Sequence, residues 1–309
     1  MCNNPYNSSF EKRKAMRFSI IQILPFFVIS CVSEVDISLN EPKKEITINC
    51  ILTPDADTVT AWLSYTKPVL SSAGFEPINK ARLILYEQGN PVGKFRQTDS
   101  TAWVLPYKIK PGEKYKIEVT TNNTTVWAET IVPQFISAEI DSLQLYHYRL
   151  EYKILIDDSP SESNYYWISA KGYSWYDGLP YYEMAGAIHT NYSFADDFNR
   201  YTETFWEGYI YSYEKYIRIT DISLPYSFIQ LQFHPSTIDF TQGPQKVFIL
   251  SVDYHLDKYM KSSLLMEEND LWAEDVPIVY APFPVYSNIH GGTGIFGSFT
   301  SVSKEFSGE

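Results

Sequence analysis

Apolar and polar residues alternate along many short stretches of this chain, and this period of two constrains the fold more than any other feature. Tyr115, Ile117 and Val119 alternate with polar neighbours, as expected of a strand with one buried face. Seven such stretches fall within residues 46–133, with turn residues at a spacing of about 8–12 residues. This spacing predicts an antiparallel β-sandwich of the immunoglobulin or fibronectin kind.

The pattern continues beyond Pro133, which marks a predicted domain boundary. Further strand-like stretches are 143–148, 151–157, 165–170, 209–219, 228–233 and 247–252. The sequence therefore predicts a second β-rich domain over residues 134–309, after an N-terminal sandwich over residues 46–133.

One stretch of the second domain departs from the strand pattern. Leu256, Met260 and Leu264 have the spacing of one helical face, and Asp257 and Lys261 form an i,i+4 charge pair. We therefore predict a mainly β chain with two antiparallel β-sandwich domains and one short helix in the second.

The first thirty residues have the composition of an export signal. A basic cluster precedes the apolar run 18–29, which is too short for a membrane-spanning helix of about 20 residues. Met16 is a plausible true start, and in that case residues 1–15 are an over-long gene prediction. The alternative is a long basic region before the apolar run.

The residues that end this signal resemble a bacterial lipobox. Val28-Ile29-Ser30-Cys31 places an aliphatic residue three before a Cys and a small residue directly before it. We predict that residues 1–30 are a signal peptide and that Cys31 is the lipidation site, carrying diacylglyceryl and acyl (palmitate) chains. Residues 31–45 then form a lipidated tether, since two or three acyl chains give stable anchoring.

Removal of the signal changes the charge and the cysteine count. The whole chain carries 25 basic and 37 acidic residues, and residues 1–30 contain four of the bases and one of the acids. The mature chain would therefore carry 21 basic and 36 acidic residues, which argues against nucleic acid as a partner. Cys50 would be its one free thiol, expected to be a small buried residue.

No sequence motif supports catalysis, a cofactor or a metal site, so we predict a protein that is not an enzyme. None of the five histidines lies in a metal-binding spacing, and no nucleophile elbow is present. The glycine-rich stretch 291–294 lacks the lysine of a phosphate loop and is expected to be a tight turn or bulge. Asp196-Asp197 lacks the pattern of a calcium loop.

Aromatic residues concentrate in one stretch of the second domain. Residues 173–213 hold 14 aromatics among 41 residues and interrupt the strand pattern as a long insertion. Aromatic rings suit stacking on sugars or packing against a partner chain. The predicted ligand-binding residues are Trp175, Tyr176, Tyr181, Tyr182, Tyr192 and Trp206. The alternative is that these rings pack the insertion onto its own sandwich.

The ends of the mature chain resemble one family, the Bacteroidetes outer-membrane lipoproteins catalogued as a domain of unknown function. The most specific match is the C-terminal Ser287-Asn288-Ile289-His290-Gly291-Gly292-Thr293-Gly294-Ile295-Phe296-Gly297, preceded by Asp253-Tyr254. Weaker matches are Cys31, the stretch 46–52, Pro111-Gly112-Glu113-Lys114-Tyr115, Asp141-Ser142 and Asn164-Tyr165-Tyr166. The resemblance implies β-sandwich domains and genes beside TonB-dependent transporters.

These observations give a leading hypothesis and two alternatives. We expect a non-catalytic outer-membrane lipoprotein that captures a glycan or peptide ligand for a TonB-dependent transporter, or braces that transporter. The cell surface is favoured over the periplasmic face, because the acidic residues that follow Cys31 resemble the signal that sends some Bacteroidetes lipoproteins to the cell surface. The first alternative is a structural or adhesive surface lipoprotein without a small ligand. The second, a hydrolase, requires an acid pair or nucleophile that folding alone would bring together.

Overall fold

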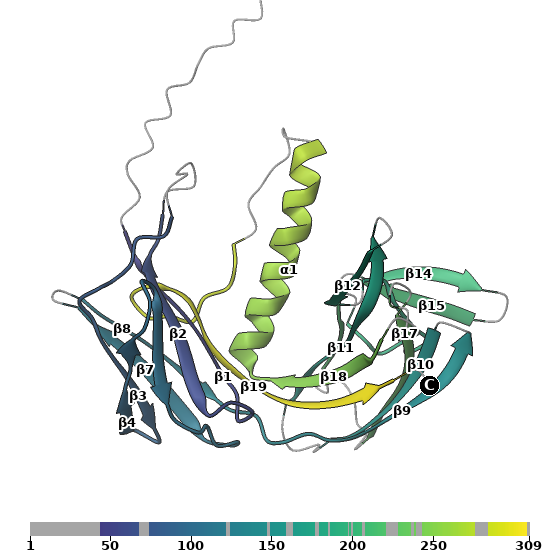
Figure 1. Ribbon diagram of the computed structural model, residues 1–309, viewed down its shortest axis with the longest axis horizontal. Helices are drawn as coiled ribbons and strands as arrows, with labels where there is room; N and C mark the ends of the chain where they lie inside the picture. Colours follow the sequence, from purple (N-terminus) through teal and green to yellow (C-terminus); the bar gives the residue numbers. More distant parts are fainter. Residues whose placement is uncertain are drawn as a thin grey trace, which may run out of the picture. The chain divides into compact units, whose positions relative to one another are not determined.

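The described part of the chain is mainly β and contains one long helix (Figure 1). The computed structural model describes residues 44–307 apart from 68–73, 122–123, 147–148, 159–162, 177–178, 185, 197, 199, 206–207, 221–227, 236–237, 239–242 and 276–283. The predicted signal peptide and tether, with Cys31, lie outside the described residues. Residues 42–309 form one compact unit, because their Cα atoms contact one another throughout this range.

The first eight strands belong to the predicted N-terminal sandwich. They are β1 (Ile46–Leu52), β2 (Thr58–Tyr65), β3 (Arg82–Glu87), β4 (Asn90–Lys94), β5 (Arg96–Gln97), β6 (Ala102–Pro106), β7 (Lys114–Thr120) and β8 (Thr125–Ile131). Strands β4-β3-β7-β8 form a four-stranded sheet, whereas β1-β2-β6-β5 form one end of a nine-stranded sheet. The first core, made mainly of buried side chains from β1, β2, β3, β6, β7 and β8, contains residues of both sheets.

The alternation predicted for β7 is confirmed by its burial. Tyr115, Ile117 and Val119 are fully buried, while their neighbours are exposed or half-buried. The Tyr115 hydroxyl accepts a hydrogen bond from the backbone amide of Lys110 at 3.0 Å. This bond ties the turn before β7 to the buried start of that strand.

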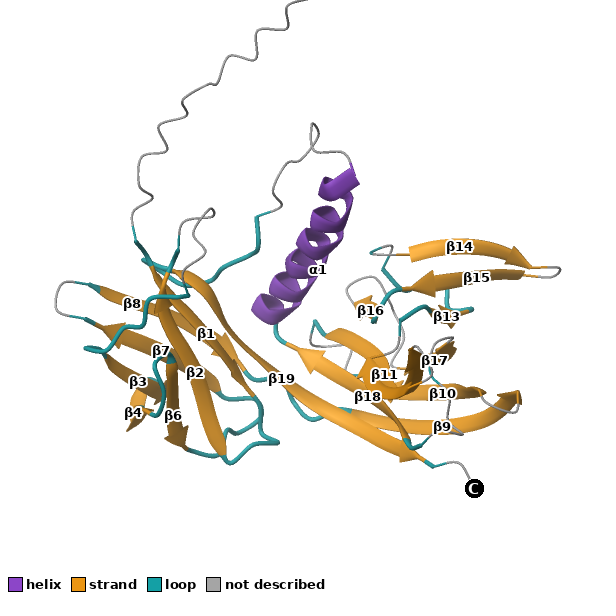
Figure 2. Cartoon of the chain, turned by 45° about the horizontal axis from the view of Figure 1, so that its top comes forward, coloured by secondary structure: helices purple, strands orange, loops and turns teal. Residues whose placement is uncertain are grey.

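The remaining strands follow the linker after β8 (Figure 2). They are β9 (Ser137–Tyr146), β10 (Arg149–Asp157), β11 (Tyr165–Tyr176), β12 (Leu179–Met184), β13 (Ile188–Thr190), β14 (Arg200–Phe205), β15 (Gly208–Tyr213), β16 (Ile217–Thr220), β17 (Phe228–Pro235), β18 (Gln245–Val252) and β19 (Thr293–Phe306). Strands β14-β15-β13-β17-β10-β9 form a six-stranded sheet. The second core contains buried side chains of this sheet and of β11, β16 and β18.

The last strand, β19, joins the two halves of the nine-stranded sheet. Residues 293–298 pair in parallel with β1, and residues 299–306 pair antiparallel with β18. Phe296 of this strand lies in the first core, and Phe306 packs against the second. One C-terminal strand therefore completes both halves of the described chain.

The helix α1 (Tyr254–Asp275) covers the other face of β11, β18 and β19. Tyr166 and Ile168 of β11 enter the second core, while Trp167 between them enters a third core beneath α1. Leu256 of α1 is buried against Trp167 in that third core. The alternation of β11 thus buries both faces of the strand, one in the second core and one under the helix.

The structure corrects three expectations and leaves one open. The predicted short helix spans 22 residues. The terminal stretch 293–306, for which no strand was predicted, is a 14-residue strand. Residues 173–213 contain the strands β12 to β15, so this stretch belongs to the sheets and does not interrupt the strand pattern. The mainly β class is confirmed, although β1 and β19 pair in parallel. The count of two sandwich domains stays a prediction, because one sheet contributes to both cores.

Candidate functional site

Asp253 directly precedes the helix α1, and its carboxylate holds three elements together. Its Oδ1 accepts a hydrogen bond from the Leu256 amide at 2.6 Å, which makes Asp253 the N-cap. Its Oδ2 accepts from the Ser298 hydroxyl of β19 at 2.9 Å and from the Thr130 hydroxyl of β8. One buried side chain therefore fixes the start of α1 against β8 and β19.

Burial raises the pKa of Asp253 above its ordinary value, although the hydrogen bonds from Leu256, Thr130 and Ser298 favour the charged form. A carboxyl group with a raised pKa beside a pocket is a common sign of acid–base catalysis. Here both oxygens already accept hydrogen bonds from the protein. Its position is accounted for by the cap, and the prediction that the chain is not an enzyme stays a prediction.

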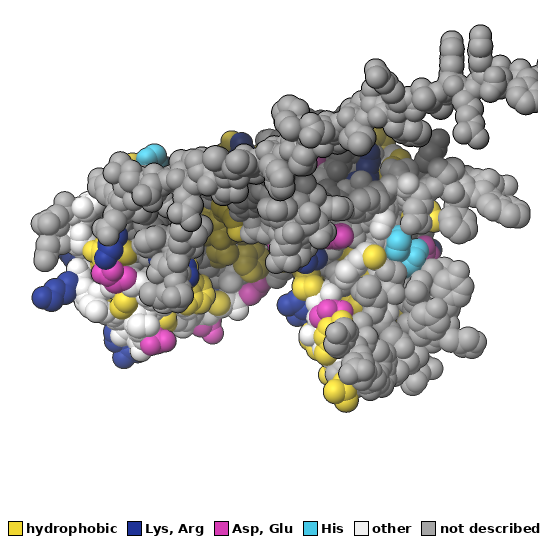
Figure 3. Space-filling view, turned by 90° about the horizontal axis from the view of Figure 1, so that it is seen from above, with side chains coloured by type: hydrophobic (Ala, Val, Ile, Leu, Met, Phe, Trp, Pro, Cys, Tyr) yellow, Lys and Arg dark blue, Asp and Glu magenta, His cyan; other side chains and the backbone are white. Residues whose placement is uncertain are grey.

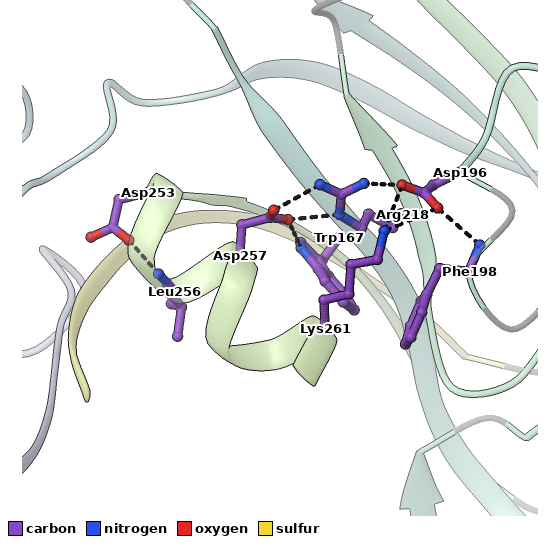
Figure 4. A network of polar contacts seen from close by, with 8 residues as sticks. All are labelled: Trp167, Asp196, Phe198, Arg218, Asp253, Leu256, Asp257 and Lys261. Atoms are coloured by element: carbon purple, nitrogen blue, oxygen red, sulfur yellow. Dashed lines mark hydrogen bonds and ion pairs between the residues drawn. The ribbon is translucent and has the colours of Figure 1, made fainter. Parts of the chain in front are cut away.

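A second polar cluster fixes the next turn of α1 to β16 (Figure 4). Arg218 donates to both oxygens of Asp257, from Nε and from Nη2, at 2.7 Å each. The Trp167 indole donates to the same carboxylate at 2.9 Å. Because Arg218 and Asp257 are both buried, this two-point ion pair is shielded from water.

Asp196 completes the cluster on the far side of Arg218 (Figure 4). Burial alone would raise the pKa of Asp196, but the Phe198 amide and the charges of Arg218 and Lys261 lower it below its ordinary value. Lys261 lies 3.2 Å from Asp196, so the predicted i,i+4 partner of Asp257 pairs with Asp196 instead. Two cations thus balance two carboxylates.

A pocket of about 500 Å³ opens beside the start of α1. Its lining residues come from the β6–β7 turn, the end of β8, the start of β11 and the start of α1: Gly112, Lys114, Glu129, Thr130, Ile131, Val132, Pro133, Gln134, Ser163, Asn164, Tyr165, Val252, Asp253, Tyr254 and His255. Asp253 lines this pocket and also caps the helix. The hydrogen bonds that fix the start of α1 therefore also fix part of the pocket wall.

Two tyrosine rings and one ion pair give the pocket its chemistry. The rings of Tyr165 and Tyr254 lie with centroids 6.3 Å apart, and Tyr254 is 48% exposed. The ammonium of Lys114 lies 2.7 Å from the carboxylate of Glu129. His255 shares a hydrogen bond of 2.8 Å with the Tyr286 hydroxyl. Ring faces beside hydrogen-bonding groups suit the binding of a polar organic ligand.

Of the six predicted aromatic residues, the structure describes the side chains of three, and these differ in burial. Tyr181 and Tyr182 lie on β12, an edge strand, and are 39% and 50% exposed. Tyr192 is half-buried against the second core, and burial raises its pKa. Trp175 and Tyr176 belong to β11, but their side chains are not described. Trp206 lies outside the described residues.

The residues of the pocket at α1 were not singled out from the sequence as a site. The one available signal was Asp253 directly before a helical period, which is the pattern of an N-cap. Its contacts with Thr130 and Ser298 join positions far apart in the sequence, which no local pattern reveals. Among the described residues, no group of three His, Cys, Asp or Glu side chains is placed to hold a metal ion.

The glycine-rich stretch is a tight turn that leads directly into β19, which is the first of the two expected forms. Gly294 has a φ of +108°, and a Cβ there would lie 2.1 Å from the carbonyl oxygen of Ile48. Asn288 holds the turn closed, because its side chain donates to the Phe296 carbonyl at 2.8 Å and accepts from the Phe296 amide at 3.0 Å. The motif therefore lets β19 approach β1 closely.

This C-terminal arrangement belongs to a longer pattern, because the model of one protein family matches residues 32–305. The chain belongs to that family. It is described as Domain of unknown function (DUF4249). No curated protein matches this DUF4249 chain. No helix within the described residues is long and apolar enough to cross a membrane.

Two solved structures share a distant likeness with this DUF4249 chain. One is the collagen-binding domain of the Erysipelothrix rhusiopathiae surface protein RspB, at 8% identity over 84% of this chain and 94% of that chain, with a TM-score of 0.17. The other is a collagen adhesin from S. aureus, at 8% identity over 86% and 95% of the two chains, with a TM-score of 0.17. Similarity at this low identity and TM-score says nothing about what this chain binds.

Proposed function

We propose that this DUF4249 chain is a non-catalytic lipoprotein of the outer membrane that captures a ligand for a TonB-dependent nutrient transporter, or braces that transporter. The proposal places the lipid anchor on Cys31 and the protein at the cell surface. It is supported by the lipobox-like Val28 to Cys31 and by the resemblance to Bacteroidetes lipoproteins. It keeps the division into two immunoglobulin-like sandwich domains.

The observation that carries the capture of a ligand is the pocket at the start of α1. Its wall is held by the Asp253 cap and by the ion pair between Arg218 and Asp257. A binding site whose walls are already fixed loses little conformational entropy when a ligand enters. The partly exposed ring of Tyr254 then offers an apolar face at the pocket mouth.

A structural or adhesive lipoprotein without a small ligand is the second candidate. The burial of several rings in the stretch 173–213 favours it, since Tyr213 is fully buried and Phe198 is 6% exposed. Tyr181 and Tyr182 support the first candidate, because they expose aromatic surface on β12, at the end of its sheet.

A pull-down from solubilised outer membranes tests the proposed partnership. The full chain carries a C-terminal tag, and an untagged strain provides the control. We expect a TonB-dependent transporter to be recovered with the tagged chain and to be absent from the control. Recovery of the tagged chain without any transporter would contradict the partnership.

A further inference from the structure

The ion pair between Lys114 and Glu129 forms the boundary between two hollows. Both residues line the pocket at α1, and both also line a second hollow of about 530 Å³ on the outer face of the sheet β4-β3-β7-β8. The second hollow also contains Tyr86, Lys116 and Glu118. An elongated ligand that crosses the ion pair would therefore occupy both hollows.

The charged side chains of this surface are paired, so the second hollow carries no net charge. Lys114 lies 2.7 Å from Glu129, and Lys116 lies 3.0 Å from Glu118. Both basic and acidic side chains are visible among the described side chains of the face seen in Figure 3, and neither kind forms a large patch there. A surface of balanced charge does not attract an ionic ligand over long range. Its ammonium and carboxylate groups still offer donors and acceptors side by side.

An aromatic ring lies in each hollow. Tyr86 is half-buried in the outer hollow, where its hydroxyl donates to Glu118 at 3.4 Å. Lys116 lies over the Tyr86 ring at 5.6 Å and over the Trp127 ring at 5.2 Å. Tyr254 lies in the pocket at α1. Rings in both hollows, with the Lys114–Glu129 ion pair between them, suit a ligand of several hydroxylated units that each have an apolar face.

The edge strand β8 next to this surface is paired at Trp127. The backbone of His290 pairs in both directions with that of Trp127 on β8, and the two rings stack with centroids 4.0 Å apart. An extended peptide that adds to a sheet needs a free edge. At Trp127 that edge is closed, which favours a ligand held by side chains over one held by strand pairing.

We propose that the two hollows form one groove for an uncharged oligosaccharide. Sugar rings stack on Tyr86 in the outer hollow and on Tyr254 in the pocket at α1, and hydroxyl groups bond to Lys114 and Glu129 between them. This inference rests on the proposed function, since it names the ligand class that the chain captures. The ligand needs several sugar units, because it crosses from one hollow to the other.

Calorimetric titration of the full lipoprotein tests this assignment. The protein is held in a non-glycosidic detergent and titrated with neutral α- and β-linked glucans, mannans and xylans as dimers and as hexamers. We expect one hexamer to bind at least about tenfold more tightly than its dimer, because it reaches both rings. Binding should be insensitive to salt, because no charge on the ligand is screened.

Three variants report whether binding uses this groove. Tyr86→Ala and Tyr254→Ala should each weaken the hexamer by about tenfold, since each removes one ring. The control Trp62→Ala removes a ring that is 51% exposed on β2 and should leave the affinity unchanged. Equal thermal unfolding temperatures for the four proteins show that each variant folds.

A charge exchange separates a neutral ligand from a charged one. The double variant Lys114→Glu with Glu129→Lys keeps an ion pair but reverses its direction. Hydroxyl groups both donate and accept, so the affinity for the hexamer should stay within about threefold. A peptide with a fixed charge would lose its partner in this variant. Binding of charged peptides that the exchange abolishes would overturn the assignment.

The assignment is also overturned if no oligosaccharide binds, or if Tyr86→Ala and Tyr254→Ala leave the affinity unchanged. These results differ from a failure of the proposed partnership. A chain that recovers the transporter but binds no oligosaccharide refutes the ligand class alone. A chain that binds the hexamer but recovers no transporter keeps the groove and refutes the partnership.

Discussion

Arg218 of β16 donates two hydrogen bonds of 2.7 Å to Asp257 of α1, and both side chains are buried. This contact lies one turn beyond the Asp253 cap, so the first two turns of α1 are fixed at two points. The pocket at α1 takes part of its wall from Tyr254 and His255, which lie between these two points. The shape of that wall therefore depends in part on the ion pair between Arg218 and Asp257, which does not line the pocket.

Loss of the Asp257 charge is expected to destabilise the whole chain. Asp257→Asn leaves the buried Arg218 with Asp196 as its remaining carboxylate, and breaking a buried pair costs about 3 kcal/mol of unfolding free energy. Chemical denaturation measures this change. The matched control is Glu267→Gln on the same helix, whose pair with Lys215 is exposed and is worth about 0–1 kcal/mol. Equal effects of the two substitutions would contradict the role given to Asp257.

Asp253 predicts an unusual dependence of stability on pH. Burial raises its pKa in the folded chain above 3.8, so the unfolded chain releases this proton first as the pH rises. The contribution of this group is therefore full below 3.8 and is lost as the pH rises through the folded pKa. Asp253→Asn keeps a good N-cap and removes this loss.

The comparison that checks this prediction is the stability of Asp253→Asn minus that of the natural chain. Denaturation at about pH 3.5 and about pH 7 should give a difference that grows in favour of the variant at the higher pH. The difference in stability between the two proteins cancels the contributions of groups that they share. One such group is Asp196, whose lowered pKa stabilises the folded chain at neutral pH and does so less at low pH. A difference that is constant with pH would show that the folded pKa of Asp253 is not raised.

The glycine at 294 is expected to be essential for pairing β19 with β1. Gly294→Ala places a Cβ against the Ile48 carbonyl and strains a φ of +108°, so we expect a loss of more than about 4 kcal/mol or failure to fold. The control Gly89→Ala has a φ of +81° with open space around its Cβ, and should cost about 1–2 kcal/mol. A mild effect at Gly294, equal to that at Gly89, would refute the close approach.

Much of the first core could be predicted from the sequence because its strands bury one face each. The alternation of Tyr115, Ile117 and Val119 states directly which side chains of β7 are buried. The final strand was missed because its partners change along its length. Residues 293–298 lie beside β1 and residues 299–306 beside β18, so no single period describes β19.

The candidate site was harder to predict because its parts are distant in sequence. The aromatic stretch 173–213 drew attention by composition, but burial of Tyr213 shows that composition does not separate a core ring from a binding ring. The pocket at α1 is defined by Lys114, Asn164 and Tyr254, which come together only through the pairing of β8, β11 and β19 with their neighbours. Sequence patterns indicate local secondary structure and do not show which distant residues meet in the folded chain.

Lipid anchoring at Cys31 is expected to decide where the chain is found. Cys31→Ala removes the only thiol of the lipobox-like segment, so the protein should leave the membrane fraction. Fractionation followed by immunoblotting measures this change. Cys2→Ala is the control, since that residue lies in the N-terminal part of the predicted signal peptide, outside the lipobox-like segment, and should not affect anchoring. Continued membrane association of Cys31→Ala would overturn the lipoprotein assignment.

The most direct test of ligand capture is native mass spectrometry of the lipoprotein purified from its own outer membrane in a mild, non-glycosidic detergent. The account predicts a bound species that is released on unfolding, is lost in Tyr254→Ala and is retained in Trp62→Ala. A bare protein mass in every sample, or a bound species that Tyr254→Ala leaves unchanged, would contradict capture in the pocket at α1.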